Sequence, residues 1–235
     1  MLFRIILGVS LTLALLLSGC ATDKGMAVMD SPAAVTQSGK AIYLLTVTLR
    51  NNHVTAYQPK LQTIKVHQHS NAEYPKIIRF TADPLAKSES NSAAIGSSYL
   101  LRIELEPGTY TLLGLSCLGQ SVFVNGDFFA PLAISLTAST PGVYYLGHVE
   151  ASVRAHQKDE FRAGPFMPLQ EQSLTGASSG TFDVEISDHE TTDLPKFLAK
   201  FPVLNGITIQ KTVLSPFNRE RVQRWWEKNA FNDVP

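Results

Sequence analysis

The sequence contains few cysteines and no excess of charge of either sign. Its two cysteines are Cys20 and Cys117, and Lys plus Arg equal Asp plus Glu at 20 each, so the formal net charge is zero. No block of like charges is long enough to form an acidic or basic tail. Because a neutral chain has no net field to gather polyanions, we expect no nucleic-acid partner.

Internal repeats are also missing, which excludes solenoid and propeller architectures. The chain has 235 residues, of which 44% are hydrophobic and 17% charged. This composition is typical of a globular protein, and the length is ample to bury a core. We therefore expect one domain with short appendages.

The N-terminus has the three-part pattern of an export signal. Residues 1–4 hold one positive charge, residues 5–17 are apolar, and Leu17-Ser18-Gly19-Cys20 closes the segment. This tetrapeptide resembles the lipobox of bacterial lipoproteins. The resemblance implies a signal peptide over residues 1–19, cleavage before Cys20, and lipid attachment at Cys20 through diacylglyceryl and palmitate groups.

An ordinary transmembrane anchor is the alternative for this segment. The uncharged run over residues 5–22 is only just long enough to span a bilayer, whereas its apolar core has the length of a signal-peptide h-region. Ala21, rather than aspartate, follows the lipobox, and the resemblance then implies the outer membrane, at its periplasmic face. Several acyl chains would anchor the protein stably. With Cys20 acylated, Cys117 has no disulfide partner.

The pattern of the remaining chain predicts a mainly β fold. Residues 20–40 are small and polar and predict a flexible tether, and residues 41–214 predict the β domain. Pro131 indicates an edge strand or a bulge. Residues 83–97 predict a loop. Strands are predicted at 41–50, 61–67, 77–81, 98–105, 109–117, 128–137, 143–155, 181–187 and 207–214.

Helical patterns occur mainly at the C-terminal end. Asp193 predicts the cap of a short helix near residues 193–201. Residues 215–235 predict a helical tail that starts at Asn218 and docks Trp225-Trp226 on the strands. The whole pattern predicts an antiparallel β-sandwich of the prealbumin or Ig-like kind with short C-terminal helices.

Two Pro-Gly turns followed by tyrosine organise the middle of the chain. They read Pro107-Gly108-Thr109-Tyr110 and Pro141-Gly142-Val143-Tyr144-Tyr145-Leu146-Gly147. The first predicts a β-hairpin between the strands at 98–105 and 109–117. The two motifs together resemble the core of uncharacterised Gram-negative lipoproteins with prealbumin-like or carboxypeptidase-regulatory-like sandwich domains, over residues 99–187. The resemblance implies a scaffold, and no catalytic residue follows from it.

Two short motifs are weak candidates for chemistry. His67 and His69 would share one face of a strand, as metal ligands do, but no third ligand stands beside them, so no metal site is predicted. Gly114-Leu115-Ser116-Cys117-Leu118 approaches a nucleophile elbow but lacks its second glycine. We expect Ser116 to be an ordinary strand residue and Cys117 a buried thiol.

A third group combines two carboxylates with an imidazole. Asp188, His189 and Glu190 precede the predicted helix, where carboxylates suit the positive end of the helix dipole better than they indicate acid and base chemistry. Adjacent aromatic residues point to opposite faces of a strand, so the outward member of each pair could contribute to a sugar or peptide platform. The pairs are Phe128-Phe129, Tyr144-Tyr145 and Trp225-Trp226.

These observations predict a lipid-anchored cell-envelope lipoprotein that acts as a non-enzymatic binding or assembly module. We expect no catalytic, cofactor-binding or metal-binding residues, and a membrane attachment through Cys20. The expected partner is an envelope protein or wall polymer, bound by the loop at residues 155–180 or by the outward aromatics. The alternative is a small periplasmic hydrolase that uses His67 and His69 or the cluster at residues 188–190.

Overall fold

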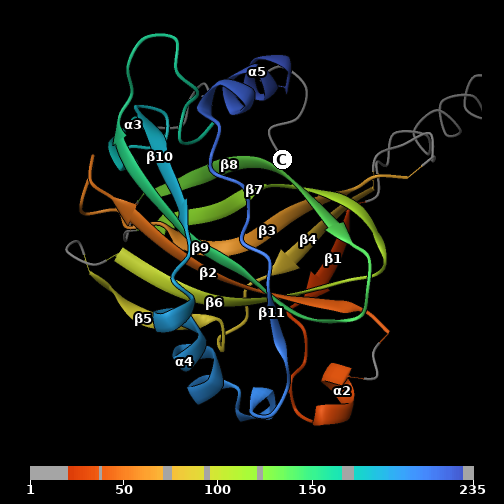
Figure 1. Ribbon diagram of the computed structural model, residues 1–235. Helices are drawn as coiled ribbons and strands as arrows, with labels where there is room; N and C mark the ends of the chain where they lie inside the picture. The colour runs from red at the N-terminus through yellow and green to blue at the C-terminus, as the bar shows by residue number, and fades with distance from the viewer. Residues whose placement is uncertain are drawn as a thin grey trace, which may run out of the picture.

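The computed structural model describes residues 21–36, 39–70, 76–92, 96–120, 124–165 and 172–229, which form two mixed β-sheets (Figure 1). The first sheet has the order β1 (Thr22–Gly25), β4 (Lys76–Thr81), β3 (Lys60–Gln68), β7 (Gly108–Gln120) and β8 (Asn125–Ala138). The second has the order β10 (Gly180–Ser187), β9 (Gly142–Ala155), β2 (Ala41–Asn51), β6 (Gly96–Leu105) and β5 (Lys87–Ser92), and β11 (Ile209–Lys211) also pairs with β9. The predicted mainly β class is confirmed.

The helices are short and lie outside the sheets. They are α2 (Pro32–Thr36), α3 (Gln172–Thr175), α4 (Glu190–Lys200), the 3₁₀ turn η1 (Pro202–Leu204) and α5 (Arg219–Asn229). In Figure 1, α4 lies below the second sheet and α5 lies above the strands. No helix in the described part of the chain is long and apolar enough to cross a membrane. The predicted signal peptide and Cys20 lie outside the described residues.

One hydrophobic core joins the inner faces of the two sheets. Val149, Ala151 and Val153 of β9 enter it by strict alternation, and they share it with Ile64 and Val66 of β3 in the other sheet. Each fully buried branched aliphatic side chain contributes about 1.5–3 kcal/mol. A core of this size explains why the domain needs no disulfide.

The predicted purely antiparallel pairing is wrong at three places. The pairs β1–β4, β2–β9 and β11–β9 are parallel. An apolar residue at every second position is compatible with either strand direction, so the alternation that predicted the strands could not predict their pairing.

Both Pro-Gly turns carry the chain from one sheet to the other. The turn at Pro107 joins β6 of the second sheet to β7 of the first, and the turn at Pro141 joins β8 of the first sheet to β9 of the second. The predicted hairpin across Pro107 is therefore wrong, because β6 pairs with β2 and β5, while β7 pairs with β3 and β8.

The tyrosine after each turn closes it with a hydrogen bond. The hydroxyl of Tyr110 donates to the carbonyl of Glu106 at 2.8 Å, and that of Tyr144 donates to the carbonyl of Thr140 at 3.1 Å. The two motifs thus share one local structure, a crossing between sheets locked by a buried tyrosine.

Two strands that the sequence did not predict are the outer strands of their sheets. The predicted tether at residues 20–40 is wrong where it is described, since β1 pairs with β4 from Thr22 and Met26 is buried. Residues 83–97, predicted to be a loop, contain β5 and the start of β6. Edge strands carry polar residues and need little apolar alternation, so their sequence signal is weak.

The predictions for Pro131 and for the tail up to Asn229 are confirmed, whereas residues 230–235 of the predicted tail lie outside the described residues. Pro131 lies on an outer strand, β8, where the pairing with β7 shifts register opposite Gly114. In the tail, the side chain of Asn218 accepts a hydrogen bond from the amide of Arg221 at 2.8 Å, as expected at the start of α5. Trp225 packs on Phe129 of β8, with ring centroids 6.0 Å apart.

Candidate functional site

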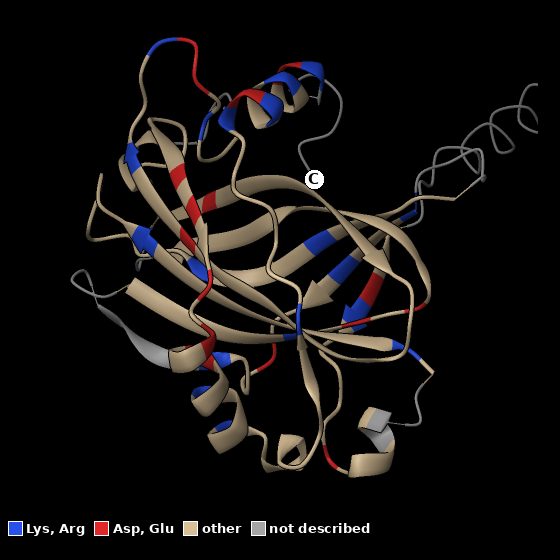
Figure 2. Cartoon of the chain, in the orientation of Figure 1, with Lys and Arg blue, Asp and Glu red and all other residues tan. Residues whose placement is uncertain are grey.

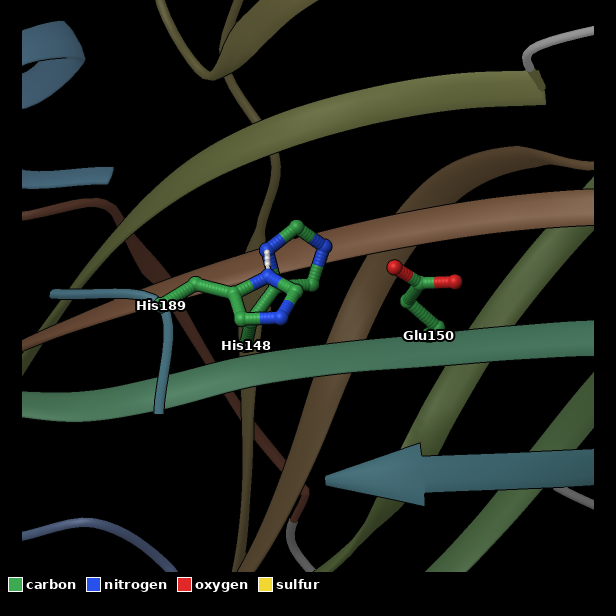
Figure 3. Close-up of side chains that lie close together, drawn as sticks. All are labelled: His148, Glu150 and His189. Carbon is green, nitrogen blue, oxygen red and sulfur yellow. Dashed lines mark hydrogen bonds between the residues drawn. The ribbon is translucent and has the colours of Figure 1, made fainter. Parts of the chain in front are cut away.

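The outer face of the second sheet carries a group of polar side chains beside α4. We call it the His148 cluster, and its members are Thr48, His148, Glu150, His189 and Asp193. Thr48 lies on β2, next to Glu150 of β9 in the parallel register. His189 lies in the short connection between β10 and α4, and Asp193 lies in the first turn of α4. Figure 3 shows the two imidazoles and Glu150.

A β-bulge in β9 directs the key side chains outward. The register between β2 and β9 shifts between Tyr145 and His148, and Gly147 within the shift has φ of +100°. A Cβ at Gly147 would lie 2.8 Å from the carbonyl oxygen of Ser187, so only glycine fits. In a regular strand, residues three positions apart face opposite sides. Because the bulge adds a residue, Tyr145 and His148 both face α4.

Asp193 is the buried anchor of the cluster, with 1% of its surface exposed. Its Oδ2 accepts hydrogen bonds from the Tyr145 hydroxyl at 2.9 Å and from Nδ1 of His148 at 3.2 Å. Burial favours the protonated acid, but the hydrogen bonds from His148 and Tyr145 outweigh it and hold the pKa of Asp193 below its ordinary value. Burial, and then the bond to Asp193, raises the pKa of Tyr145, which therefore donates as a neutral phenol.

Asp193 also orients the ring of His148. Since the carboxylate can only accept, Nδ1 of His148 carries a proton, and Nε2 lies 2.9 Å from the hydroxyl of Thr48. Nδ1 of His189 lies 3.3 Å from Nδ1 of His148, and its Nε2 lies 3.3 Å from the hydroxyl of Ser187. Every imidazole nitrogen in the cluster therefore has a defined neighbour.

Three members of the cluster have the donors of a metal site. His148, Glu150 and His189 each offer one ligand atom, and these atoms lie within 4.8 Å of one another. Figure 3 shows the Glu150 carboxylate on the side of the His148 ring away from His189 Nδ1. His148 is buried, while Glu150 and His189 are partly exposed. The arrangement could hold a cation or exchange protons with a ligand.

The predicted cluster at residues 188–190 divides in two. Asp188 and Glu190 both pair with Lys211, at 3.0 and 2.7 Å, whereas His189 turns inward to His148. The Asp188 side chain accepts from the amide of Glu190 at 3.1 Å, which supports its predicted role at the helix start. The prediction that Asp193 caps the helix is wrong, because α4 begins three residues earlier.

His67 and His69 lie on and just after β3 of the first sheet, away from the His148 cluster. Their rings share one face, with centroids 4.6 Å apart, as the spacing predicted. Burial, and then the neighbouring His69, lowers the pKa of His67. The metal-like group found among the described residues does not include them. Nε2 of His69 instead lies 2.8 Å from the hydroxyl of Thr111.

The predictions for Ser116 and Cys117 are confirmed. Both lie within β7, which continues past them as a strand, so no strand-to-helix elbow forms. Cys117 is buried in the core, and burial raises its pKa well above the ordinary range of a thiol. Such a thiol is unreactive.

The predicted aromatic platform is wrong for the strand pairs. Phe128, Phe129, Tyr144 and Tyr145 are all less than a tenth exposed. The outward members are covered, Phe129 by α5 and Tyr145 by α4. A side chain that points away from the core of the sheets is still buried when a helix covers that face.

The sequence contained a signal for part of the cluster. His148 and Glu150 have the i, i+2 spacing of a strand face, and alternation within the predicted strand at 143–155 puts both on the face opposite the core residues Val149 and Ala151. His189 and Asp193 were assigned only to the start of a helix. Their approach to β9 is a tertiary contact, so no local spacing could predict it. Comparison with protein families, with curated proteins and with solved structures finds no match for the chain.

Proposed function

We propose that this protein is a lipid-anchored cell-envelope protein whose β domain acts as a non-enzymatic binding module, with the His148 cluster as its binding site. The observation that carries the proposal is the buried support of this cluster. Asp193 holds His148 by a hydrogen bond and is itself held by Tyr145, while His189 and Glu150 remain partly exposed beside His148. A site built on strands and braced by buried hydrogen bonds is ordered before its ligand arrives, which favours binding.

The anchor follows from the lipobox-like segment that ends at Cys20. Only Ala21 separates Cys20 from β1, so a lipid on Cys20 would hold the domain against the bilayer rather than on a long tether. We place the protein at the periplasmic face of the outer membrane. The shared core between two sheets supports a sandwich of the prealbumin-like kind.

Metabolic labelling with palmitate tests the anchor. We expect the wild-type chain to incorporate label and Cys20→Ser to lose it, while Cys117→Ser, which removes the buried thiol, keeps it. Label that persists in Cys20→Ser would contradict the proposed anchor.

In-cell photo-crosslinking tests the binding role. A photoreactive residue at Thr191, exposed in the first turn of α4, should capture a discrete partner, and the combined changes Glu150→Gln and His189→Ala should abolish the adduct. The same probe at Ser135, exposed on β8 of the other sheet, is the control. Equal capture from both positions would show that the cluster is not the binding site.

A hydrolase is the second candidate, because Thr48, His148 and Asp193 have the order of a catalytic triad. The carboxylate holds Nδ1 of His148, and Nε2 faces the Thr48 hydroxyl at 2.9 Å. Glu150, however, lies beside Thr48 in the sheet register, where an acyl-transfer reaction would develop an oxyanion. A carboxylate there opposes that charge, so binding is the better-supported role.

The conservative change Thr48→Val separates the two functions. It removes the hydroxyl and keeps the shape of the side chain, so it would abolish hydrolysis of an ester or amide substrate. We expect no Thr48-dependent turnover with a panel of nitrophenyl esters. Turnover by the wild type that Thr48→Val abolishes would overturn the binding role in favour of the enzyme.

A further inference from the structure

We propose that His148, Glu150 and His189 bind a divalent transition-metal ion of the zinc class. The proposal names a ligand for the binding role proposed above and rests on it, but it is independent of the lipid anchor. Two imidazoles and one carboxylate, with donor atoms within 4.8 Å of one another, are the donor set that zinc uses in sites with three protein ligands. Imidazole donors favour zinc and its transition-metal neighbours over magnesium or calcium.

The spacing of the donors is close to what one ion requires. Ligands about 2.0–2.2 Å from a tetrahedral ion lie about 3.3–3.6 Å from one another. The donors here therefore need movements of about an ångström, and the partly exposed side chains of Glu150 and His189 can supply them by rotation. The buried His148 stays in place because Asp193 holds it.

The surroundings of His148 are those of an outer ligand shell. Metal-bound histidine usually donates its other ring N–H to a carboxylate, which fixes the ring and strengthens the donor nitrogen. Asp193 takes this position on Nδ1 of His148 and leaves Nε2 for the ion. The Tyr145 hydroxyl in turn holds Asp193, and Ser187 lies beside His189. This support extends over β9, β10 and α4.

Charge also favours a dication. The carboxylate side chains of Asp193 and Glu150 lie beside the imidazoles of His148 and His189. A dication balances the two carboxylates, which no neutral ligand does. Thr48, whose hydroxyl contacts Nε2 of His148, must turn aside, and three protein ligands leave a fourth position for water or a group from the partner.

Calorimetric titration with Zn²⁺ tests the site. The full chain is purified in detergent without a polyhistidine tag, stripped with a chelator and desalted. We expect one Zn²⁺ per chain, and Co²⁺ in its place should give the intense visible absorption of a tetrahedral ion. A wild-type chain that binds no stoichiometric Zn²⁺ would overturn the proposal.

Matched variants locate the ion. Glu150→Gln and His189→Ala, which alter partly exposed side chains, should each weaken Zn²⁺ binding by more than the roughly 10- to 100-fold typical of an outer-shell partner. The control His67→Ala/His69→Ala removes the other close imidazole pair and should leave the affinity unchanged. Loss of binding in the His67→Ala/His69→Ala control, or its retention in His189→Ala, would contradict the assignment.

These results are separable from the proposed function. If Zn²⁺ fails to bind while the crosslink from Thr191 persists and depends on the cluster, the metal assignment is wrong and the binding role stands. If Zn²⁺ binds and no cluster-dependent crosslink forms, the proposed partner is wrong and the metal site stands.

Discussion

Single residues in this fold hold charge in buried positions, and Asp193 is the clearest case. Its carboxylate accepts from Tyr145 and His148 while almost fully buried. In Asp193→Asn the amide loses the charge and presents a donor toward one of these groups. We expect a loss of about 2–4 kcal/mol in the free energy of unfolding, measured by urea titration with chelator present. Asp188→Asn, at an exposed pair with Lys211, is the control and should change little.

Lys65 on β3 shows the opposite effect, a buried charge that destabilises. It is 6% exposed, and burial, followed by repulsion from Arg79, lowers its pKa from 10.5 to about 8. Lys65→Met removes the free-energy cost of burying this charge, but it loses the contact of the ammonium group with the Phe129 ring, whose centroid lies 5.5 Å away. We expect a gain of about 1–2 kcal/mol in the free energy of unfolding near neutral pH.

The pH dependence of Lys65 has a defined sign. Its folded pKa lies below its unfolded value, so between about 8 and 10.5 the unfolded chain binds more protons and stability rises with pH. The advantage of Lys65→Met should therefore shrink when urea titrations are repeated at about pH 10. Lys60→Met, an exposed change on the same strand, should show no such trend. An advantage that stays constant with pH would contradict the assigned cause.

At the scale of elements, the bulge in β9 positions the cluster. Gly147→Ala would force a Cβ against the Ser187 carbonyl at a positive φ, which should lower the free energy of unfolding by about 1–3 kcal/mol. It should also weaken Zn²⁺ binding, because the bulge sets the direction of His148. Gly25→Ala on β1, where the new Cβ meets nothing within 4 Å, is the control. An unchanged Zn²⁺ affinity in a folded Gly147→Ala would show that the bulge does not position the site.

The sequence predicted strands correctly where apolar alternation is strong. It failed for features that depend on which strands pair with one another. The predicted strand at 143–155 corresponds to β9, and period-two alternation within it puts His148 and Glu150 on one face. The polar outer strands β1 and β5 had no such pattern. Neither the direction of pairing nor the sheet crossing at Pro107 leaves a local trace, because both depend on long-range contacts. For the same reason the sequence indicated only part of the candidate site, since His189 and Asp193 reach it through tertiary packing.

At the scale of the whole molecule, an ionic network ties the C-terminal helix to the second sheet. Glu160 pairs with Arg154 of β9 and with Arg219 of α5, and both arginines also pair with Asp183 of β10. In Figure 2, α5 carries both basic and acidic residues, and acidic residues lie on β10, the strand that pairs with β9. The hydrogen bond from Arg154 is the main cause that lowers the pKa of Glu160 from 4.5 to about 2.

This network predicts an acid-sensitive contribution to stability. The folded pKa of Glu160 is depressed, so its contribution is present above about pH 4.5 and is lost as pH falls toward about 2. Glu160→Gln should lower the free energy of unfolding by about 1 kcal/mol near neutral pH and by less at the acid end, measured by urea titration. Glu220→Gln, in an exposed pair with Arg224, is the control. A difference that persists unchanged at the acid end would contradict the assignment.

The whole molecule combines a two-sheet scaffold, a braced polar cluster on one outer face and an N-terminal strand that begins at Thr22. The His148 cluster is the proposed site of a zinc-class ion. The most direct measurement is an anomalous-scattering map of the Zn²⁺-loaded full chain at the zinc edge. We expect one peak bonded to His148, Glu150 and His189. A peak between His67 and His69, or no ordered peak, would contradict it.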